Sequence, residues 1–288
     1  MILMTQKHLW AAAVLFLAAL GGGAGAAEER HTLFNPVPKD RLRPLSADRP
    51  DSTESPYTVD AGHVQLEADI AAWFQDKAQE DGARVRRTGW AFAVTNVKLG
   101  LTPNVDLQLV VETYRRERTS DRDAGTRTVM EGFGDLTVRT KINVWGNDGG
   151  ETAFAVMPFV LFPTNQDDLG GNDVEGGIIF PFATELPCGW GLGLQLEFDL
   201  VRDSADTGYE LDISHTIVLG HDIVGDLAGF IEIFSLFPGE SGADWVGTLN
   251  AGLTYGVNDD LQLDIGVQIG ISRAADDLAV FTGVTRRW

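Results

Sequence analysis

The sequence predicts an all-β protein, a transmembrane antiparallel up-and-down β-barrel of twelve strands. Three observations lead to this fold class: long segments of alternating apolar and polar residues, short turns that alternate with longer loops, and an N-terminal export signal. The clearest segment is 261–272, with large aliphatic residues at most odd positions and polar, acidic or glycine residues at even ones. Such a strand has one apolar and one polar face. Its length suits a tilted strand, which needs about 9–11 residues to cross a bilayer.

Eleven further segments can form strands of the same barrel. In most of them polar residues such as Glu67 and Gln108 alternate with aliphatic ones. Segments 153–161 and 178–183 are apolar on both faces, so periodicity does not orient them, and ten strands is the alternative if this pair is misread. The full set is 63–70, 91–101, 105–113, 135–144, 153–161, 178–183, 190–200, 210–219, 227–235, 245–255 and 278–288.

The connections between these segments alternate in length. Short turns rich in Gly, Asn, Asp and Pro, the residues that tight turns favour, lie at 102–104, 146–150, 187–189, 224–226 and 257–260. Longer, more charged links lie near 79–87, 119–127, 165–173, 203–208, 238–243 and 273–277. An even strand count with both termini on the short-turn side is the plan of bacterial outer-membrane barrels, whose short turns are periplasmic.

The N-terminal residues divide into two segments before the barrel. Lys7 and His8, an apolar run and Ala24-Gly25-Ala26 follow the pattern of a secretory signal peptide over 1–26. Residues 27–56 are charged and rich in proline, and we expect an extended or disordered periplasmic arm there; folding back as a plug is the less favoured alternative. The barrel is expected over 57–288. Export of such a barrel predicts the outer membrane of a Gram-negative bacterium.

Composition narrows the functional classes. The formal net charge of −20 argues against binding of nucleic acid, which requires clustered Lys and Arg. The single cysteine, Cys188, excludes an internal disulfide framework. The loop 165–173 is rich in oxygen ligands, but it lacks the spaced pattern of a calcium loop, so an acidic solvated loop is favoured. We predict neither a metal site nor a cofactor.

The polar faces of the strands define candidate lumen or constriction residues. Acidic groups dominate, and they would favour cations in an open pore. The alternative is a hydrogen-bonded ladder that fills the barrel, since twelve strands lie between the filled and the open size classes. Phe133 and Phe230 could instead line a path for an apolar solute. The candidates are Glu67, Asp69, Asp106, Glu112, Asp135, Arg139, Lys141, Glu197, Asp199, Asp212, Glu232 and Asp264.

The chain ends on an aromatic residue, Trp288. Outer-membrane barrels generally close with a strand of this kind, so we expect Trp288 to act as an assembly signal for the barrel-insertion machinery. The apolar strand faces predict outer-membrane lipid as a further partner. Arg286 would lie on the lipid side, where a charge near the interface costs little.

Several segments together resemble the family of outer-membrane transporters named for the MetA pathway of phenol degradation. The resemblance covers most of the chain from about residue 54 to the end. It implies an outer-membrane β-barrel associated with transport and with aromatic degradation, without an established substrate or catalytic residues. The segments are Ser55–His63, Gly132–Leu136, Trp145–Gly150, Met157–Pro158, Pro163–Asn165 and Gly220–Asp222.

Three functions are compatible with this barrel. The leading one is a channel or transporter for passive passage of small molecules, with hydrophobic or aromatic compounds as candidate solutes. The second is a closed barrel with a structural or surface-binding role. The third is a lipid-active enzyme that uses Ser235 and His215 on the outer face, which we do not favour because no segment resembles a phospholipase motif.

Overall fold

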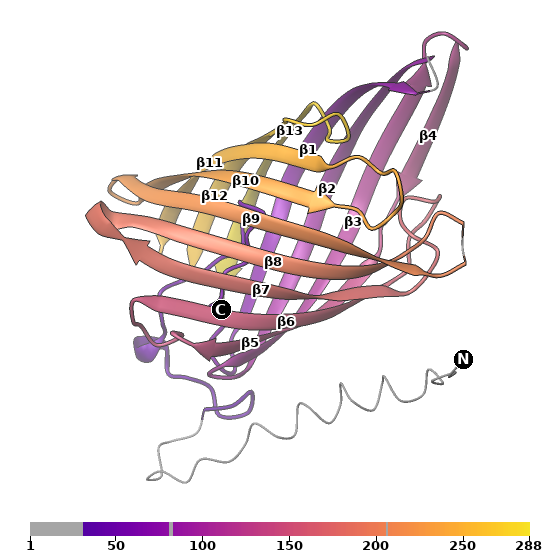
Figure 1. The fold of residues 1–288 in the computed structure, drawn as a ribbon. Coiled ribbons are helices and arrows are strands. Elements are labelled where there is room, and N and C mark those ends of the chain that lie inside the picture. The colour runs from indigo at the N-terminus through magenta and orange to yellow at the C-terminus, as the bar shows by residue number, and fades with distance from the viewer. Residues whose placement is uncertain (1–30, 81–82, 206) are drawn as a thin grey trace. The chain divides into compact units, whose positions relative to one another are not determined.

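The computed structural model describes residues 31–80, 83–205 and 207–288, and residues 31–288 form one compact unit. The predicted signal peptide over 1–26 and the start of the predicted arm lie outside the described residues. Figure 1 shows the main feature, a β-barrel. None of the described helices is long and apolar enough to cross a membrane.

The described part of the chain contains two short 3-10 turns, η2 (Lys39–Arg41) and η3 (Pro187–Gly189), and thirteen strands. The alternating segments of the sequence all lie in strands, and most strands extend beyond the predicted bounds. The strands are β1 (Val64–Glu80), β2 (Ala83–Thr102), β3 (Val105–Asp121), β4 (Thr126–Gly132), β5 (Leu136–Trp145), β6 (Thr152–Phe162), β7 (Glu175–Leu186), β8 (Trp190–Arg202), β9 (Tyr209–Val224), β10 (Leu227–Phe237), β11 (Val246–Asn258), β12 (Leu261–Gly270) and β13 (Leu278–Arg287).

The sheet closes on itself. Each strand pairs antiparallel with its sequence neighbour, and β1 pairs with β13, which joins the two ends of the chain of strands. β4 and β5 both pair with β3, one along each half of it, so they share one position in the wall. The thirteen strands therefore make a closed twelve-stranded barrel, which confirms the predicted fold class.

Short turns gather at one end of the barrel, together with the start of β1 and the end of β13. There the backbone N–H of Trp288 donates to the carbonyl of Val64 (2.9 Å). At the opposite end the prediction differs in two places. Residues near 79–87 and 119–127 are mostly strand rather than loop, because β1 to β4 continue as long hairpins that project beyond the other strands (Figure 1). Their charged residues misled the interpretation, although charged side chains are compatible with a strand that water surrounds on both faces.

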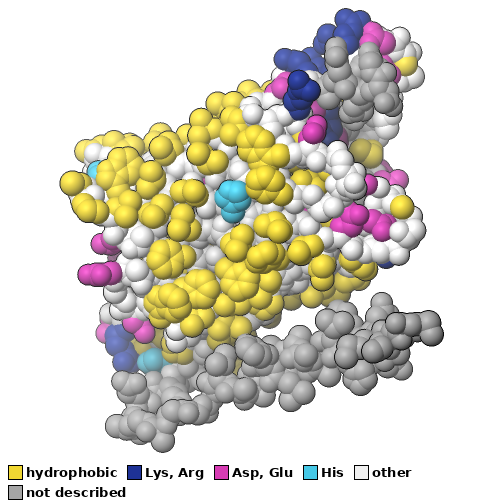
Figure 2. All heavy atoms as spheres, viewed as in Figure 1, with side chains coloured by type: hydrophobic (Ala, Val, Ile, Leu, Met, Phe, Trp, Pro, Cys, Tyr) yellow, Lys and Arg dark blue, Asp and Glu magenta, His cyan; other side chains and the backbone are white. Residues whose placement is uncertain are grey.

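The outer face of the wall is apolar and the inner face is polar (Figure 2). In β12, Leu263, Ile265 and Ile269 are exposed outward, whereas Asp264 is buried inside the barrel. This orientation follows from the period-two alternation of the sequence. β6 and β7, which periodicity could not orient, turn small or unbranched residues inward, including the fully buried Ala153 and Met157.

The wall of β1 to β3 contains one irregular level. Pairing between β1 and β2 runs to Ala68↔Thr95 and resumes at Ala72↔Ala91. β1 also has a register shift against β13 between Asp69 and Ala71, and Ala93 of β2 has a positive φ of 53°. Bulges of this kind reverse which side chains point inward.

The reversal is visible in the side chains beyond that level. Trp90, Phe92 and Tyr114 stack side by side on the outer face, with neighbouring ring centroids 6.1 and 6.3 Å apart. On the inner face, the guanidinium of Arg115 lies 5.3 Å from the centre of the Phe74 ring. The period-two pattern therefore holds on both sides of the irregular level, but with opposite parity.

Candidate functional site

The N-terminal arm lies inside the barrel, which corrects the expectation of an extended periplasmic arm. It begins at the short-turn end, where the N–H of Leu33 donates to the carbonyl of Leu101 (2.9 Å). From Arg43 it turns into the lumen and returns at Asp60, where the two limbs meet through the Arg43–Asp60 ion pair (2.7 Å). The arm is ordered because its polar groups are paired with the lumen, an outcome that its own composition does not reveal.

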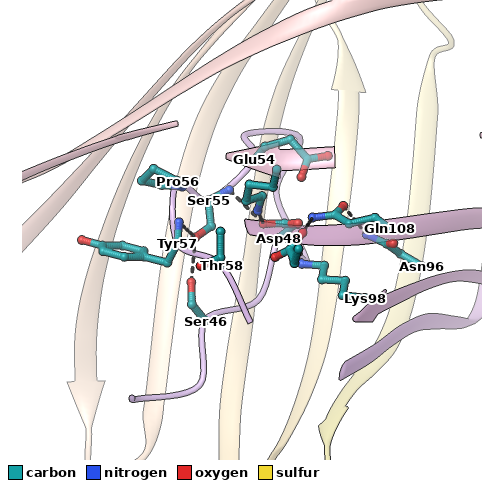
Figure 3. Close-up of polar contacts among 12 residues, drawn as sticks. Ser46, Asp48, Glu54, Ser55, Pro56, Tyr57, Thr58, Asn96, Lys98 and Gln108 are labelled. Carbon is teal, nitrogen blue, oxygen red and sulfur yellow. Dashed lines mark hydrogen bonds and ion pairs between the residues drawn. The ribbon is translucent and has the colours of Figure 1, made fainter. Parts of the chain in front are cut away.

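Asp48 is the central contact between the arm and one side of the wall (Figure 3). Its carboxylate is paired with the ammonium groups of Lys98 on β2 and Lys141 on β5, the second at 2.6 Å. Its backbone N–H donates to Glu67 on β1 (3.0 Å), and Glu67 is also paired with Lys98. All of these side chains are buried, so each charge depends on its partners for the stabilisation that water would otherwise supply.

Arg49, the next residue, reaches the opposite side of the β1–β13 junction. Its guanidinium binds Asp69 on β1 and Asp264 on β12, each at 2.8 Å. It also lies 5.8 Å from the centre of the Phe281 ring. A planar guanidinium with several fixed donors is suited to bridging two carboxylates in this way.

The tip of the arm contacts the wall of β8 to β10. The N–H of Ser52 donates to Glu232 (2.9 Å), and the hydroxyl of Thr53 bonds to both Glu232 and Thr216 at 2.6 Å. Glu54 then crosses back towards β5, where its carboxylate is paired with Arg139. The tip therefore spans the lumen from one side to the other.

The returning limb is fixed by side chains at the short-turn end. The N–H of Val59 donates to Asp106 (3.0 Å), and the N–H of Thr58 donates to Asn147 (3.0 Å). One ring nitrogen of His63 bonds to the carbonyl of Val37 (2.7 Å) and the other to that of Trp288 (2.8 Å). His63 thus joins the arm to the last residue of the barrel.

Two cavities remain in the lumen, on opposite sides of Arg49 and Pro50, which line both. The first, of about 340 Å³, lies towards the long-loop end and includes Phe74 and Phe281. The second, of about 520 Å³, lies towards the short-turn end and includes Phe230. The arm therefore divides the space within the barrel into two compartments.

Comparison with known proteins places this arrangement in a family. A family model described as "Putative MetA-pathway of phenol degradation" matches residues 47–288. The chain belongs to this family. The match begins at residue 47, so it includes the part of the arm that enters the lumen. A search of the curated proteins finds no match.

Solved structures with a similar fold are outer-membrane barrels. An outer membrane channel from Pseudomonas putida F1 is 14% identical, with 84% of this chain and 100% of that chain covered and a TM-score of 0.61, which shows a shared fold. The NanC porin is 10% identical (77% and 98% covered, TM-score 0.49). The translocator domain of the autotransporter NalP from Neisseria meningitidis is 11% identical (78% and 88% covered, TM-score 0.49).

In this family member, the candidate lumen residues fall into two groups. The first group bonds to the arm, and most of its members lie in the half of the lumen nearer the short turns. A ring of free carboxylates is therefore not what the lumen presents, because arm cations and donors occupy several of them. The group consists of Glu67, Asp69, Asp106, Arg139, Lys141, Glu232 and Asp264.

The second group makes its contacts elsewhere. Asp135 closes the β6–β7 loop by accepting from the Asn165 side chain (2.8 Å) and the Gly171 N–H (3.1 Å). Asp212 likewise accepts from the N–H of Gly239 (2.8 Å) in the β10–β11 loop. The remaining members lie on the inner wall nearer the long loops; they are Glu112, Glu197 and Asp199.

Sequence reasoning missed the arm side of this network. Asp48, Arg49 and Glu54 were not candidates, because a charged segment rich in proline is typical of a solvated tail. The available signal was complementarity: the polar strand faces already contained Lys98, Arg139 and Lys141, which need buried anionic partners in a narrow barrel.

Neither of the other candidate chemistries is assembled. Ser235 and His215 are direct partners in the β9–β10 ladder, but the His215 ring stacks on Phe237 (5.7 Å), and the described hydrogen bonds include none between the two residues. Within the described ranges, no group of His, Cys, Asp or Glu side chains could hold a metal ion. The loop 165–173 is instead closed by Asp135.

Proposed function

We propose that this protein is an outer-membrane channel for the passive passage of small molecules, with hydrophobic or aromatic compounds as candidate solutes. The observation that carries the proposal is the divided lumen: a closed barrel holds a cavity on each side of an inserted arm. An apolar outer face and a polar inner face suit a barrel that is surrounded by lipid and encloses water.

The arm holds the axial path closed in this state. Its contacts are hydrogen bonds and ion pairs, which water can replace when the arm moves. We therefore expect polar solutes and ions to pass only when the Arg49–Pro50 segment is displaced. A closed barrel with a structural role is the competing function, and it would keep the arm permanently in place.

Two features favour an apolar or aromatic solute over a purely ionic one. The cavity near the long loops contains the rings of Phe74 and Phe281, with Arg115 over the former. Aromatic faces combined with guanidinium groups bind small aromatic molecules that also have a polar edge. We assign transport rather than catalysis, since no nucleophile and base are brought together in the described residues.

Reconstitution tests this function. Ion conductance and the flux of small aromatic compounds should be measured for the full chain, for Arg49→Gln, and for the exposed-site control Arg84→Gln. We expect low conductance for the full chain and the control, and larger or more frequent openings for Arg49→Gln, because the arm loses its bridge to Asp69 and Asp264. Absence of passage in every variant would favour the closed barrel.

We also propose that Trp288 is the assembly signal read by the barrel-insertion machinery. Its side chain is exposed at the end of the wall, and the guanidinium of Arg286 lies 5.9 Å from its ring centre. Trp288→Ala should lower the amount of barrel inserted into the outer membrane, measured as heat-modifiable protein on a gel. Unchanged insertion would contradict this role.

A further inference from the structure

The irregular level of β1 and β2 lies between the lumen and an external groove. On the lumen side, the cavity near the long loops reaches Ala72, Ala91 and Val94. On the outer side, a groove of about 830 Å³ runs across β11, β12, β13 and β1 and reaches Ala71 and Trp90. The wall between the two spaces is built largely from alanines at this level.

The two spaces share lining residues. Ala72, Trp73 and Phe281 line both the lumen cavity and the outer groove. Elsewhere the wall is continuous: β8 and β9 are paired without interruption from Trp190↔His221 to Arg202↔Tyr209. The thin part of the wall thus coincides with the place where strand pairing lapses.

We propose that the barrel has a lateral exit between β1 and β2, at residues 69–71 and 92–94, through which a small apolar molecule passes from the lumen cavity into the surrounding lipid. This inference rests on the proposed channel function and specifies the route and the class of solute.

The backbone at this level is prepared for a gap in strand pairing. The carbonyl of Ala93 accepts from the hydroxyls of Thr95 (2.8 Å) and Thr113 (2.7 Å). Side chains therefore satisfy a backbone group at membrane depth, where an unsatisfied one would cost several kcal/mol. Widening the gap between 69–71 and 92–94 breaks no β1–β2 ladder pair, because the pairing has already lapsed there.

The position of the exit also suits transfer into lipid. Ile70 and Ile265, at the same height on the outer face, are more than half exposed and belong to the apolar belt. Trp90, Phe92 and Tyr114 lie just beyond, towards the long loops, where an aromatic girdle marks the edge of the bilayer. A molecule that leaves beneath this girdle enters hydrocarbon directly.

The axial alternative is unfavourable for the same molecule. Beyond the lumen cavity it would meet Arg49, Asp69 and Asp264 and then the buried ion pairs of Asp48. Desolvating or separating these charges for an apolar solute offers no compensating contact. Lipid, by contrast, takes up apolar surface favourably.

The test is uptake of 1-N-phenylnaphthylamine, an apolar aromatic probe that fluoresces in lipid, by cells with the full-length protein in their outer membrane. Ala72→Trp fills the shared wall position, and Ala228→Trp is the matched change in the other lumen cavity. We expect Ala72→Trp to lower uptake to that of cells without the protein, and Ala228→Trp to leave it at the wild-type rate. Heat-modifiable migration checks folding, and Ala72→Leu with Ala228→Leu is the milder pair if a tryptophan variant fails to insert.

The outcomes separate the exit from the channel itself. If Ala228→Trp abolishes uptake and Ala72→Trp does not, the lateral exit is wrong and the solute follows the axis, while the channel function stands. If the wild-type protein passes neither the probe nor ions, even as Arg49→Gln, the channel function itself fails. Loss of probe uptake in Ala72→Trp with unchanged ion conductance in Ala72→Trp/Arg49→Gln supports the lateral exit.

Discussion

The two sides of the barrel hold the arm by different chemistry. On the side of β2 and β5, wall cations receive arm carboxylates, as in the pairs of Lys141 with Asp48 and Arg139 with Glu54. On the side of β9 and β10, the wall supplies the carboxylate of Glu232, and the arm supplies neutral N–H and hydroxyl donors. The first side binds through paired charges and the second through polar hydrogen bonds, so the two should respond differently to the loss of one partner.

The largest effect is expected from Asp48→Ala. This change leaves the buried ammonium group of Lys141 without its carboxylate, and removing one member of a buried ion pair costs about 3–5 kcal/mol. The free energy of unfolding in detergent should fall by that order, and channel openings should increase. Asp40→Ala, on an exposed part of the same arm, is the control and should change neither quantity.

A smaller loss is expected from Thr53→Val on the other side of the barrel. The change preserves shape but removes the hydroxyl that bonds to Glu232 and Thr216, and an unmade buried hydrogen bond costs about 1–3 kcal/mol. The same unfolding measurement checks it. A loss as large as that of Asp48→Ala would mean that the two sides do not differ in the way described.

The irregular wall and the continuous wall should differ in their response to glycine. Ala93→Gly relieves a left-handed backbone, which costs an L-residue about 1–2 kcal/mol, so stability should rise or stay level. Ala251→Gly, in the regular β11, should destabilise by about 0.5–1 kcal/mol. Destabilisation of equal size at both positions would show that the level at Ala93 is not special.

The smallest effect is expected outside the barrel wall, at the Arg84–Asp123 pair (2.7 Å) on the projecting hairpins. The hydrogen bonds from Arg84 lower the pKa of Asp123. Any stabilisation from this lowered pKa is present at neutral pH and is lost as the pH falls through the folded-state value, below 3.8. Because both side chains are exposed, Asp123→Asn should leave stability near pH 7 unchanged. A measurable loss there would show that the hairpins contribute to the barrel.

The sequence by itself determined the wall. Period-two alternation in segments such as 261–272 sets which residues face outward, and turn residues such as Asn258 set where strands end, because both depend on local backbone geometry. The closed barrel, its twelve positions and the inward direction of Lys141 and Asp264 follow from these local signals.

Only the tertiary structure decided what fills the barrel. Asp48 and Arg49 meet Lys141 and Asp264 across large separations in sequence, and a proline-rich charged segment is ordered only once such partners surround it. The reversal at Ala93 also depends on tertiary contacts, since the hydroxyl of Thr113 on the neighbouring strand holds its carbonyl. Local pattern fixes a strand's faces, whereas pairing of buried charges is a property of the assembled lumen.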